Sequence, residues 1–230
     1  MNEPYDVLIA RASRALAVAG LFDMHGHISV RDGEAIWIND RGSSRISVAP
    51  AQVAHVRIAD GKALRGEPPA ETALHLGAYR ARGDVGSVAH FHPLFATAFA
   101  TAGRPLVTAY NAGARFGRVV PVFDDPDLVR TEAQGRALAA ALGSCPAALI
   151  RGHGVIVAER DVPACATASL FLEESARRLA ATIPLGEPKP FSDDEIRRVT
   201  ASIWQPFVIA KTWTDLLERA RLAGVLADLD

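Results

Sequence analysis

Apolar residues recur at helical spacing in the first segment of the chain. From Tyr5 to Ala19 they fall every three or four positions and Gly20 follows as a stop signal, so this stretch predicts a helix. Other helices are predicted where a proline suits a first turn or where alanine and leucine dominate. They are Pro69–Arg82, a helix opened by Pro93, Leu128–Leu142 and Val162–Ala181.

Short runs of β-branched and other apolar residues alternate with turns that contain glycine. They predict strands at Ile28–Arg31, Ala35–Ile38, Arg45–Val48, Val53–Ile58, Val85–His92, Ala147–Ile150 and Val155–Ala158. Asp60-Gly61 suits a tight hairpin turn, because both residues tolerate positive φ. The whole pattern is typical of an α/β sandwich, a mostly antiparallel sheet with helices on its faces.

The C-terminal part of the chain has a different pattern. Residues 183–190 contain three prolines and predict a linker. Ser192-Asp193-Asp194-Glu195 then matches a helix capping box, and helical material continues to about Ala223 with a break at Pro206. We therefore expect a catalytic domain over residues 1–182 and a helical extension over 183–230 that packs on the same domain.

Composition narrows the class of protein. The chain of 230 residues is long enough to bury a core without disulfides, and its two cysteines, Cys145 and Cys165, predict buried free thiols. A net charge of −1 gives no reason to expect a nucleic acid or a membrane surface as partner. We find no signal peptide and no apolar run of about 18 residues, so a cytoplasmic enzyme is expected.

Two histidines end the strand Val85–His92. In a strand, residues i and i+2 share a face, so His90 and His92 project side by side while Phe91 points to the opposite face. Such a pair suits zinc or a similar ion. A third histidine, His153, stands between Gly152 and Gly154, which allow close approach of the backbone. Three histidines and a water form a usual open catalytic site.

Polar residues in two other segments are further candidates for the site. Glu71 lies near the start of a predicted helix, where it is either an ordinary carboxylate that complements the helix dipole or a general acid/base near the metal. His75, one turn later, is expected to be an ordinary, partly exposed residue. In Gly26–Arg31, alternation puts His27, Ser29 and Arg31 on one strand face, which is either a solvent face or the wall of a pocket.

Together these motifs resemble the class II aldolase/adducin family over roughly residues 5–182. The resemblance rests on the segment Gly26–Arg31, on Glu71, on Asp84–Pro93 and on Arg151–Gly154. It implies an α/β/α sandwich, commonly a homotetramer with active sites between subunits. It also implies one divalent metal ion, usually Zn2+ and in some relatives Mn2+ or another ion, held by His90, His92 and His153. Glu71 is then the acid/base that approaches the metal.

The departures from the family's sugar-phosphate enzymes bear on the substrate. Those relatives carry Asn where this chain has His27, and a Ser pair where it has Pro69-Ala70. Pro50 is followed by Ala51-Gln52 instead of Thr-Gly or Ser-Gly. Because a desolvated phosphate dianion needs donors, and because Pro69 lacks an N–H, we expect a substrate that is not a sugar phosphate.

His27 and the Arg151–Gly154 motif resemble instead the family's decarboxylases, which act on hydroxylated aromatic acids such as dihydroxyphthalates or on ring-cleavage dienoates. This predicts a metal-dependent lyase in aromatic catabolism, in which the metal stabilises the enolate left when CO2 departs. Arg31, Arg151 and Ser29 are then candidates for binding the substrate carboxylates. Glu71, whose pKa we expect to be raised, would deliver the proton, with His27 and Tyr110 as secondary catalytic candidates.

Other readings of the sequence stay open at this stage. An aldolase or dehydratase of a small, sugar-like substrate would share the same metal site. A non-catalytic scaffold of the adducin type would lack bound metal, and an iron-dependent oxygenase on the same scaffold would consume oxygen. The small-molecule substrate is expected to be a carboxylate in the favoured reading.

Overall fold

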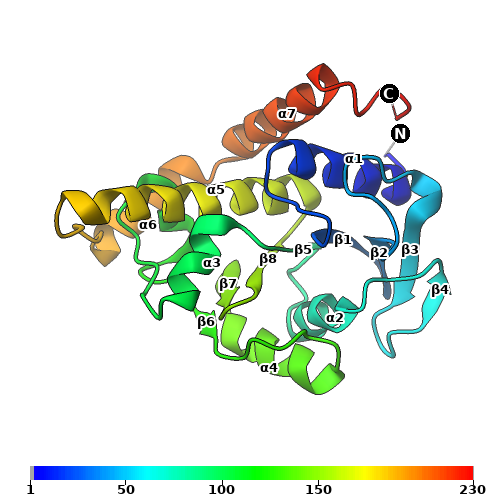
Figure 1. Cartoon of the computed structure of the whole chain (residues 1–230), viewed down its shortest axis with the longest axis horizontal. Coiled ribbons are helices and arrows are strands. Elements are labelled where there is room, and N and C mark those ends of the chain that lie inside the picture. Colours follow the sequence, from blue (N-terminus) through cyan, green and yellow to red (C-terminus); the bar gives the residue numbers. More distant parts are fainter. Residues whose placement is uncertain (1–2, 230) are drawn as a thin grey trace.

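The computed structural model describes residues 3–229. Four strands follow the first helix, helices and strands then intermix, and the chain ends in three helices (Figure 1). The helices are α1 (Tyr5–Val18), α2 (Thr72–Ala81), α3 (Leu94–Thr101), α4 (Glu132–Leu142), α5 (Val162–Thr182), α6 (Asp193–Ile203) and α7 (Pro206–Leu222), with short 3-10 turns at Pro50–Gln52, Asn111–Phe116 and Ile183–Leu185. The strands are β1 (His27–Asp32), β2 (Ala35–Asn39), β3 (Val53–Arg57), β4 (Ala63–Arg65), β5 (Ser87–Phe91), β6 (Val122–Phe123), β7 (Ala147–Ile150) and β8 (Gly154–Glu159).

The strands form one eight-stranded sheet in the order β4-β3-β2-β1-β5-β8-β7-β6. Every described pair is antiparallel except β6 with β7, which is parallel. The predicted, mostly antiparallel sheet is therefore confirmed, and the sheet as a whole is mixed. The predicted hairpin turn at Asp60-Gly61 joins β3 to β4, and Gly61 has the positive φ of +71° that such a turn needs.

Alternation along the strands produces two separate cores. On β5, Ala89 and Phe91 face a core shared with α1, α3 and α5, whereas Val88 faces a core shared with α2 and α4. Helices thus cover both faces of the sheet, three layers in all (Figure 1). None of the helices in the described part of the chain is long and apolar enough to cross a membrane.

The structure corrects three details of the sequence prediction. Arg45–Val48 is not a strand, because the Arg45 guanidinium donates to the carbonyls of Asp40 and Ser43 and holds the segment in turns. The predicted helix from Leu128 begins only at Glu132, because Thr131 and Gln134 form a capping box there. The short edge strands β4 and β6 were not predicted.

The C-terminal helices lie against the rest of the molecule. The predicted capping box is present at Ser192, and the break falls before Pro206. Leu216 and Ala220 of α7 are buried in the same core as α1 and α5. The boundary between residues 182 and 183 as a division between domain and extension stays a prediction.

Candidate metal centre and active site

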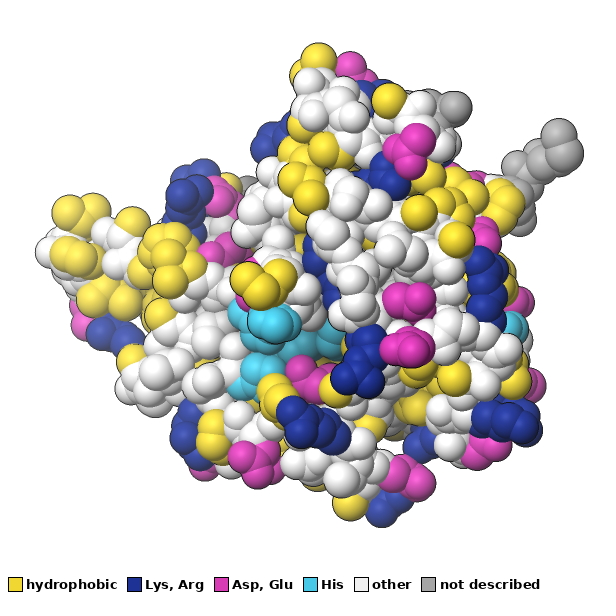
Figure 2. All heavy atoms as spheres, turned by 45° about the vertical axis from the view of Figure 1, so that its right-hand side comes forward, with side chains coloured by type: hydrophobic (Ala, Val, Ile, Leu, Met, Phe, Trp, Pro, Cys, Tyr) yellow, Lys and Arg dark blue, Asp and Glu magenta, His cyan; other side chains and the backbone are white. Residues whose placement is uncertain are grey.

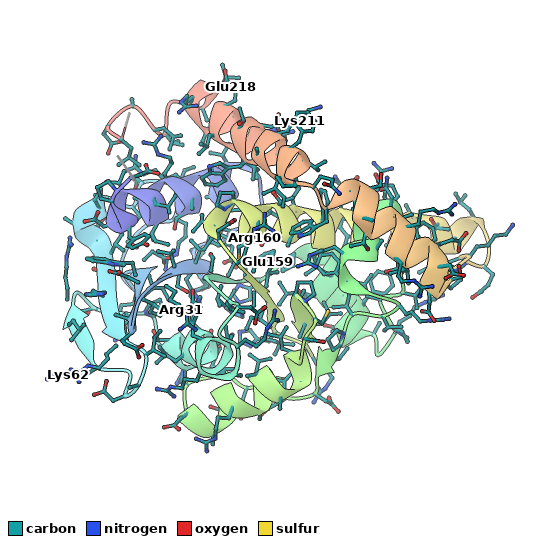
Figure 3. All side chains as sticks on the ribbon, turned by 180° about the vertical axis from the view of Figure 1, so that it is seen from behind. Arg31, Lys62, Glu159, Arg160, Lys211 and Glu218 are labelled. Atoms are coloured by element: carbon teal, nitrogen blue, oxygen red, sulfur yellow. The ribbon has the colours of Figure 1, made fainter. Side chains whose placement is uncertain are left out.

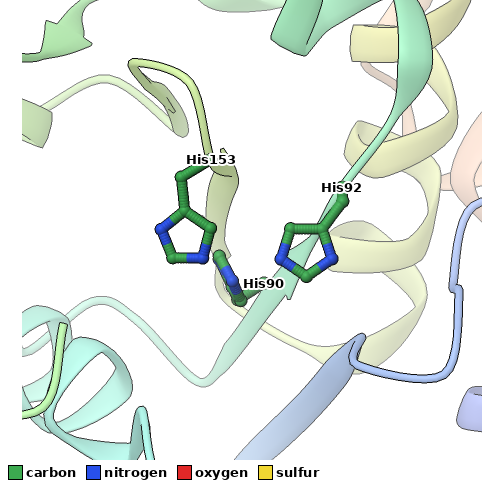
Figure 4. A group of neighbouring side chains, drawn as sticks. All are labelled: His90, His92 and His153. Carbon is green, nitrogen blue, oxygen red and sulfur yellow. The ribbon is translucent and has the colours of Figure 1, made fainter. Parts of the chain in front are cut away.

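Three histidine side chains converge at the end of β5 and the start of β8. Their rings point toward a common space (Figure 4), and the centroid of the His90 ring lies 4.9 Å from that of His92 and 4.9 Å from that of His153. One ring nitrogen from each lies within 4.8 Å of the others. The end of β5 and the start of β8 approach closely because residue 154 is a glycine: a Cβ there would lie 2.5 Å from the Phe91 carbonyl oxygen.

Hydrogen bonds fix the orientation of two of the rings. Nδ1 of His90 donates to the Val155 carbonyl at 2.9 Å, and Nδ1 of His92 donates to the Asp23 carboxylate at 3.0 Å. Because each of these bonds needs the proton on Nδ1, each Nε2 keeps a free lone pair. Outer partners of this kind are what metal-ligating histidines usually have.

The unsatisfied nitrogens test whether a metal fits. Nε2 of His90 and both ring nitrogens of His153 are buried and have no hydrogen-bond partner among the described residues. Leaving buried polar atoms unpaired is costly, so such atoms call for an explanation. A bound divalent ion provides one, because three imidazoles and a nearby carboxylate are a donor set that zinc and similar ions accept. The residues present therefore fit the metal that the sequence predicts.

Glu71 is that nearby carboxylate. It caps the start of α2, and its Oε1 accepts the Val129 N–H at 2.9 Å. Its Oε2 lies 3.6 Å from His90 Nε2 and 3.5 Å from His153 Nε2. Burial acts to raise the pKa of Glu71, but the neighbouring His153 and His90 rings and the Val129 N–H outweigh burial and lower it to about 2. The expectation of a raised pKa was therefore wrong, because polar partners surround this carboxylate.

A chain of buried hydrogen bonds leads from this site into the interior. Nδ1 of His27 and Nε2 of His75 are 2.7 Å apart, Nδ1 of His75 is 2.7 Å from Ser29 Oγ, and Ser29 Oγ is 2.8 Å from Tyr79 Oη. His75 is fully buried, which corrects the expectation of partial exposure. The face of β1 that carries His27 and Ser29 packs on α2, so Ser29 supports His27 through His75.

A cavity of about 460 Å³ opens beside the histidines. Figure 2 shows histidine side chains gathered at one place on the surface, with basic side chains close by. No serine, threonine or tyrosine stands among the described residues that line the cavity. The lining residues are His25, His27, Arg41, Arg45, Pro69, Ala70, Glu71, His92, Leu128, Arg130 and His153.

Four of the predicted substrate-binding and catalytic residues do not line this cavity. Ser29 is fully buried, with its hydroxyl against His75 and Tyr79, so it does not bind substrate as predicted. The other three lie elsewhere. The Arg31 guanidinium donates to the carbonyls of Val85, Tyr79 and Arg82 beside α2 (Figure 3), so its donors are occupied by the backbone. Arg151 pairs with Asp124 at the surface, and Tyr110 lies under the Arg178 guanidinium beside α5. In this chain none of the three lines the histidine cavity.

Sequence reasoning missed the residues that complete the site. Arg41 and Arg45 come from the loop after β2, and Arg130 comes from the loop before α4. Asp23, which holds His92, also accepts the N–H groups of His25 and Gly26 and so shapes the turn into β1. In the sequence, the position of Asp23 just before the Gly26–Arg31 motif was the one feature that could have indicated its role. No hydrophobic pattern or motif pointed to the three arginines.

The fold is that of the class II aldolases, and the histidine site is one that could hold a divalent metal ion. The family described as Class II Aldolase and Adducin N-terminal domain matches residues 7–180, and the chain belongs to this family. The chain is similar to the 3,4-dihydroxyphthalate decarboxylase of Rhodococcus jostii, with 29% identity over 93% of this chain and 95% of that protein.

Other relatives carry other names. The 5-methylthioribulose-1-phosphate/5-deoxyribulose-1-phosphate aldolase of Rhodospirillum rubrum is 29% identical over 76% of this chain and 79% of that protein. Among solved structures, an L-fuculose 1-phosphate aldolase superposes with a TM-score of 0.81 at 20% identity, covering 89% of this chain and 98% of its own. This structural match confirms the predicted fold.

Proposed function

We propose that this protein is a metal-dependent carbon–carbon lyase that decarboxylates a non-phosphorylated hydroxy-aromatic or dienoic carboxylic acid. The observation that carries the proposal is the meeting of His90, His92, His153 and Glu71 at a cavity whose nearby wall is Pro69 and Ala70. The cavity lining lacks the hydroxyls that phosphate-binding relatives are expected to carry. The similarity to a dihydroxyphthalate decarboxylase over nearly the whole chain supports the same choice.

The metal is proposed to be one divalent ion per subunit, Zn2+ in the first instance and Mn2+ as the alternative. Bound at the three histidines, it would supply Lewis-acid stabilisation of negative charge on a substrate oxygen. Asp23 and the Val155 carbonyl keep His92 and His90 in the ligating tautomer.

Glu71 is proposed to move the proton. Its low pKa keeps it a carboxylate at neutral pH, so it is free to accept a proton. Because so weak a base needs an acidic donor, the proton it accepts would come from a substrate hydroxyl that the bound metal makes more acidic. When the bond between the ring carbon and the carboxyl carbon breaks, CO2 leaves and the electron pair stays on the ring carbon. Glu71 then gives its proton to that carbon, and His27, whose Nδ1 is held by His75, is proposed to bind a substrate hydroxyl.

The test is product analysis with 3,4-dihydroxyphthalate on metal-loaded protein. The proposal expects release of CO2 and a dihydroxybenzoate, and loss of this activity on treatment with a chelator. A second candidate, an aldolase or dehydratase, is favoured by the relatives with those names. Formation of an aldehyde from a sugar-like substrate, with no CO2 from any carboxylate offered, would favour that candidate.

The assembly is proposed to be a homotetramer with active sites between subunits, as the family resemblance implies. In this arrangement Tyr110, which lies away from the histidines of its own chain, would reach the site of a neighbouring subunit. Light scattering on the purified protein should give four times the chain mass, and Tyr110→Phe should change KM or kcat without changing the mass.

A further inference from the structure

Arg45 is a buried cation whose donor groups are only partly used. Its side chain is 5% exposed, and it lines the histidine cavity. Nη1 donates to the Asp40 carbonyl at 3.1 Å, to the Ser43 carbonyl at 2.8 Å and to Ser43 Oγ at 2.7 Å. Nε is buried without any hydrogen-bond partner in the described chain, and no contact of Nη2 is seen there either.

The free donor of this guanidinium that a ligand in the cavity can reach is Nη2, because the unpaired Nε is buried out of contact with solvent. A charged N–H group that donates to a carboxylate forms a stronger hydrogen bond than neutral groups do. Burial lowers the pKa of Arg45 to about 10, while Asp23 and Asp40 act to raise it, so the group stays charged at neutral pH. A charged donor left unpaired on a buried side chain points to an anionic ligand.

Two more arginines stand around the same cavity. Arg41 and Arg130 are exposed, and neither guanidinium has an ion pair or hydrogen bond to a described residue. Glu71 also lines the cavity, and Asp23 stands behind His92. With a divalent ion bound, the positive charge of the three guanidinium groups and the ion would exceed the negative charge of these two carboxylates. The cavity therefore suits a substrate with more than one negative charge.

The chemistry of decarboxylation decides which carboxylate the arginines hold. The departing carboxylate loses its charge as it becomes neutral CO2, so a cation paired with it would stabilise the ground state more than the transition state. A carboxylate that the substrate keeps remains charged throughout, and pairing it orients the ring without opposing the reaction. The departing group is better placed against the apolar lining residues Pro69, Ala70 and Leu128.

We propose that Arg45, assisted by Arg41 and Arg130, binds the carboxylate that the substrate retains, and that this makes the enzyme selective for substrates with two carboxylates. The inference rests on the proposed decarboxylase function. A catechol-type acid with a single carboxylate should therefore be a poor substrate, because one carboxylate cannot both leave as CO2 and remain paired with Arg45.

The test is a binding measurement that needs no turnover. The probes are 3,4-dihydroxybenzoate, which has a retained carboxylate, and catechol, which has none. Calorimetry on the zinc-loaded wild type should show 3,4-dihydroxybenzoate binding roughly 10- to 100-fold more tightly than catechol, as expected for a charged hydrogen-bonded pair. In Arg45→Gln that preference should fall to less than about threefold with catechol affinity unchanged, while Arg45→Lys should be intermediate.

Arg57→Gln is the matched control, because Arg57 is a partly exposed arginine of β3 that pairs with Asp60 and does not line the cavity. If Arg45→Gln does not fold or does not hold zinc, Arg45→Lys replaces it, because lysine keeps the positive charge but lacks the planar guanidinium and should reduce the preference. A preference for 3,4-dihydroxybenzoate that stays as large as in the wild type in the usable variant overturns the proposal. Failure of the decarboxylase function itself would appear separately, as absence of CO2 in the wild type.

Discussion

At the scale of single residues, Glu71 combines two contacts that can be separated by mutation. One carboxylate oxygen accepts the Val129 N–H, and the other faces His90 and His153. A glutamine keeps the first contact through its amide oxygen but cannot carry a proton. Glu71→Gln should therefore fold and bind metal, yet lose about 10²- to 10⁴-fold in kcat, as is typical when a general acid/base is removed.

Activity and metal content measured on the same sample check this prediction. Glu132→Gln is a suitable control, because Glu132 is an exposed carboxylate in the first turn of α4. If Glu71→Gln retains full turnover, Glu71 has no role in proton transfer.

His75 gives the stability of the metal-free protein a pH dependence. Burial, with the nearby His90, lowers the pKa of His75 from 6.5 to about 3. Between these values the unfolded chain binds a proton that the folded chain does not, so stability is lost as the pH falls below about 6.5. Each histidine of this kind changes the free energy of unfolding by about 1.4 kcal/mol per pH unit within that range.

Urea unfolding of the metal-free protein at several pH values measures that slope. His75→Gln should reduce it by about one proton. Tyr79→Phe removes the hydroxyl that lies 2.8 Å from Ser29 Oγ and should cost about 1 kcal/mol at every pH without changing the slope. Equal slopes in wild type and His75→Gln would contradict the account of this buried network.

At the scale of elements, the metal site depends on how closely β5 approaches β8. A Cβ on Gly154 would lie 2.5 Å from the Phe91 carbonyl oxygen and 2.8 Å from His92 Cδ2. Gly154→Ala must therefore shift His92 and should weaken zinc binding by about 10-fold or more, the size of effect seen when ligand orientation is disturbed. Competition with a chromogenic chelator measures this affinity.

Gly83→Ala serves as the control for that measurement, because a Cβ on Gly83 would meet no atom within 4 Å. Unchanged zinc affinity in Gly154→Ala would show that the approach of the two strands does not position His92.

The elements also show how far the sequence predicts this structure. The alternation of side chains along a strand correctly predicted that Phe91 and His90 point to opposite faces of the sheet. Both residues are buried, because helices cover both faces. The same kind of pattern wrongly predicted a strand at Arg45–Val48, where the Arg45 guanidinium donates to the nearby carbonyls of Asp40 and Ser43, a contact that a hydrophobic pattern does not record. The His75 environment and the arginines of the cavity depend on packing between β1, α2 and two loops, which local patterns do not record.

At the scale of the whole molecule, Arg14 links helix α1 to the segment that follows α7. This buried side chain of α1 donates to the carbonyls of Val48 and Val225 and pairs with Asp228. Arg14→Met keeps the volume but leaves the two carbonyls unpaired, and it should lower the free energy of unfolding by about 2–3 kcal/mol.

Urea unfolding followed by fluorescence and circular dichroism checks this prediction, and both probes should report one transition if residues 183–230 belong to the same cooperative unit. Arg219→Met, at an exposed pair with Asp215, should cost about 0.5 kcal/mol or less. Two separate transitions would instead make the C-terminal helices an independent unit.

Metal analysis and CO2 release, measured on wild type and His92→Ala prepared in parallel, decide whether the three histidines form a catalytic metal site. The account predicts about one divalent ion per chain in the wild type, CO2 from 3,4-dihydroxyphthalate, and loss of both in a His92→Ala protein that remains folded. A His92→Ala variant that keeps its metal and full activity would contradict the account.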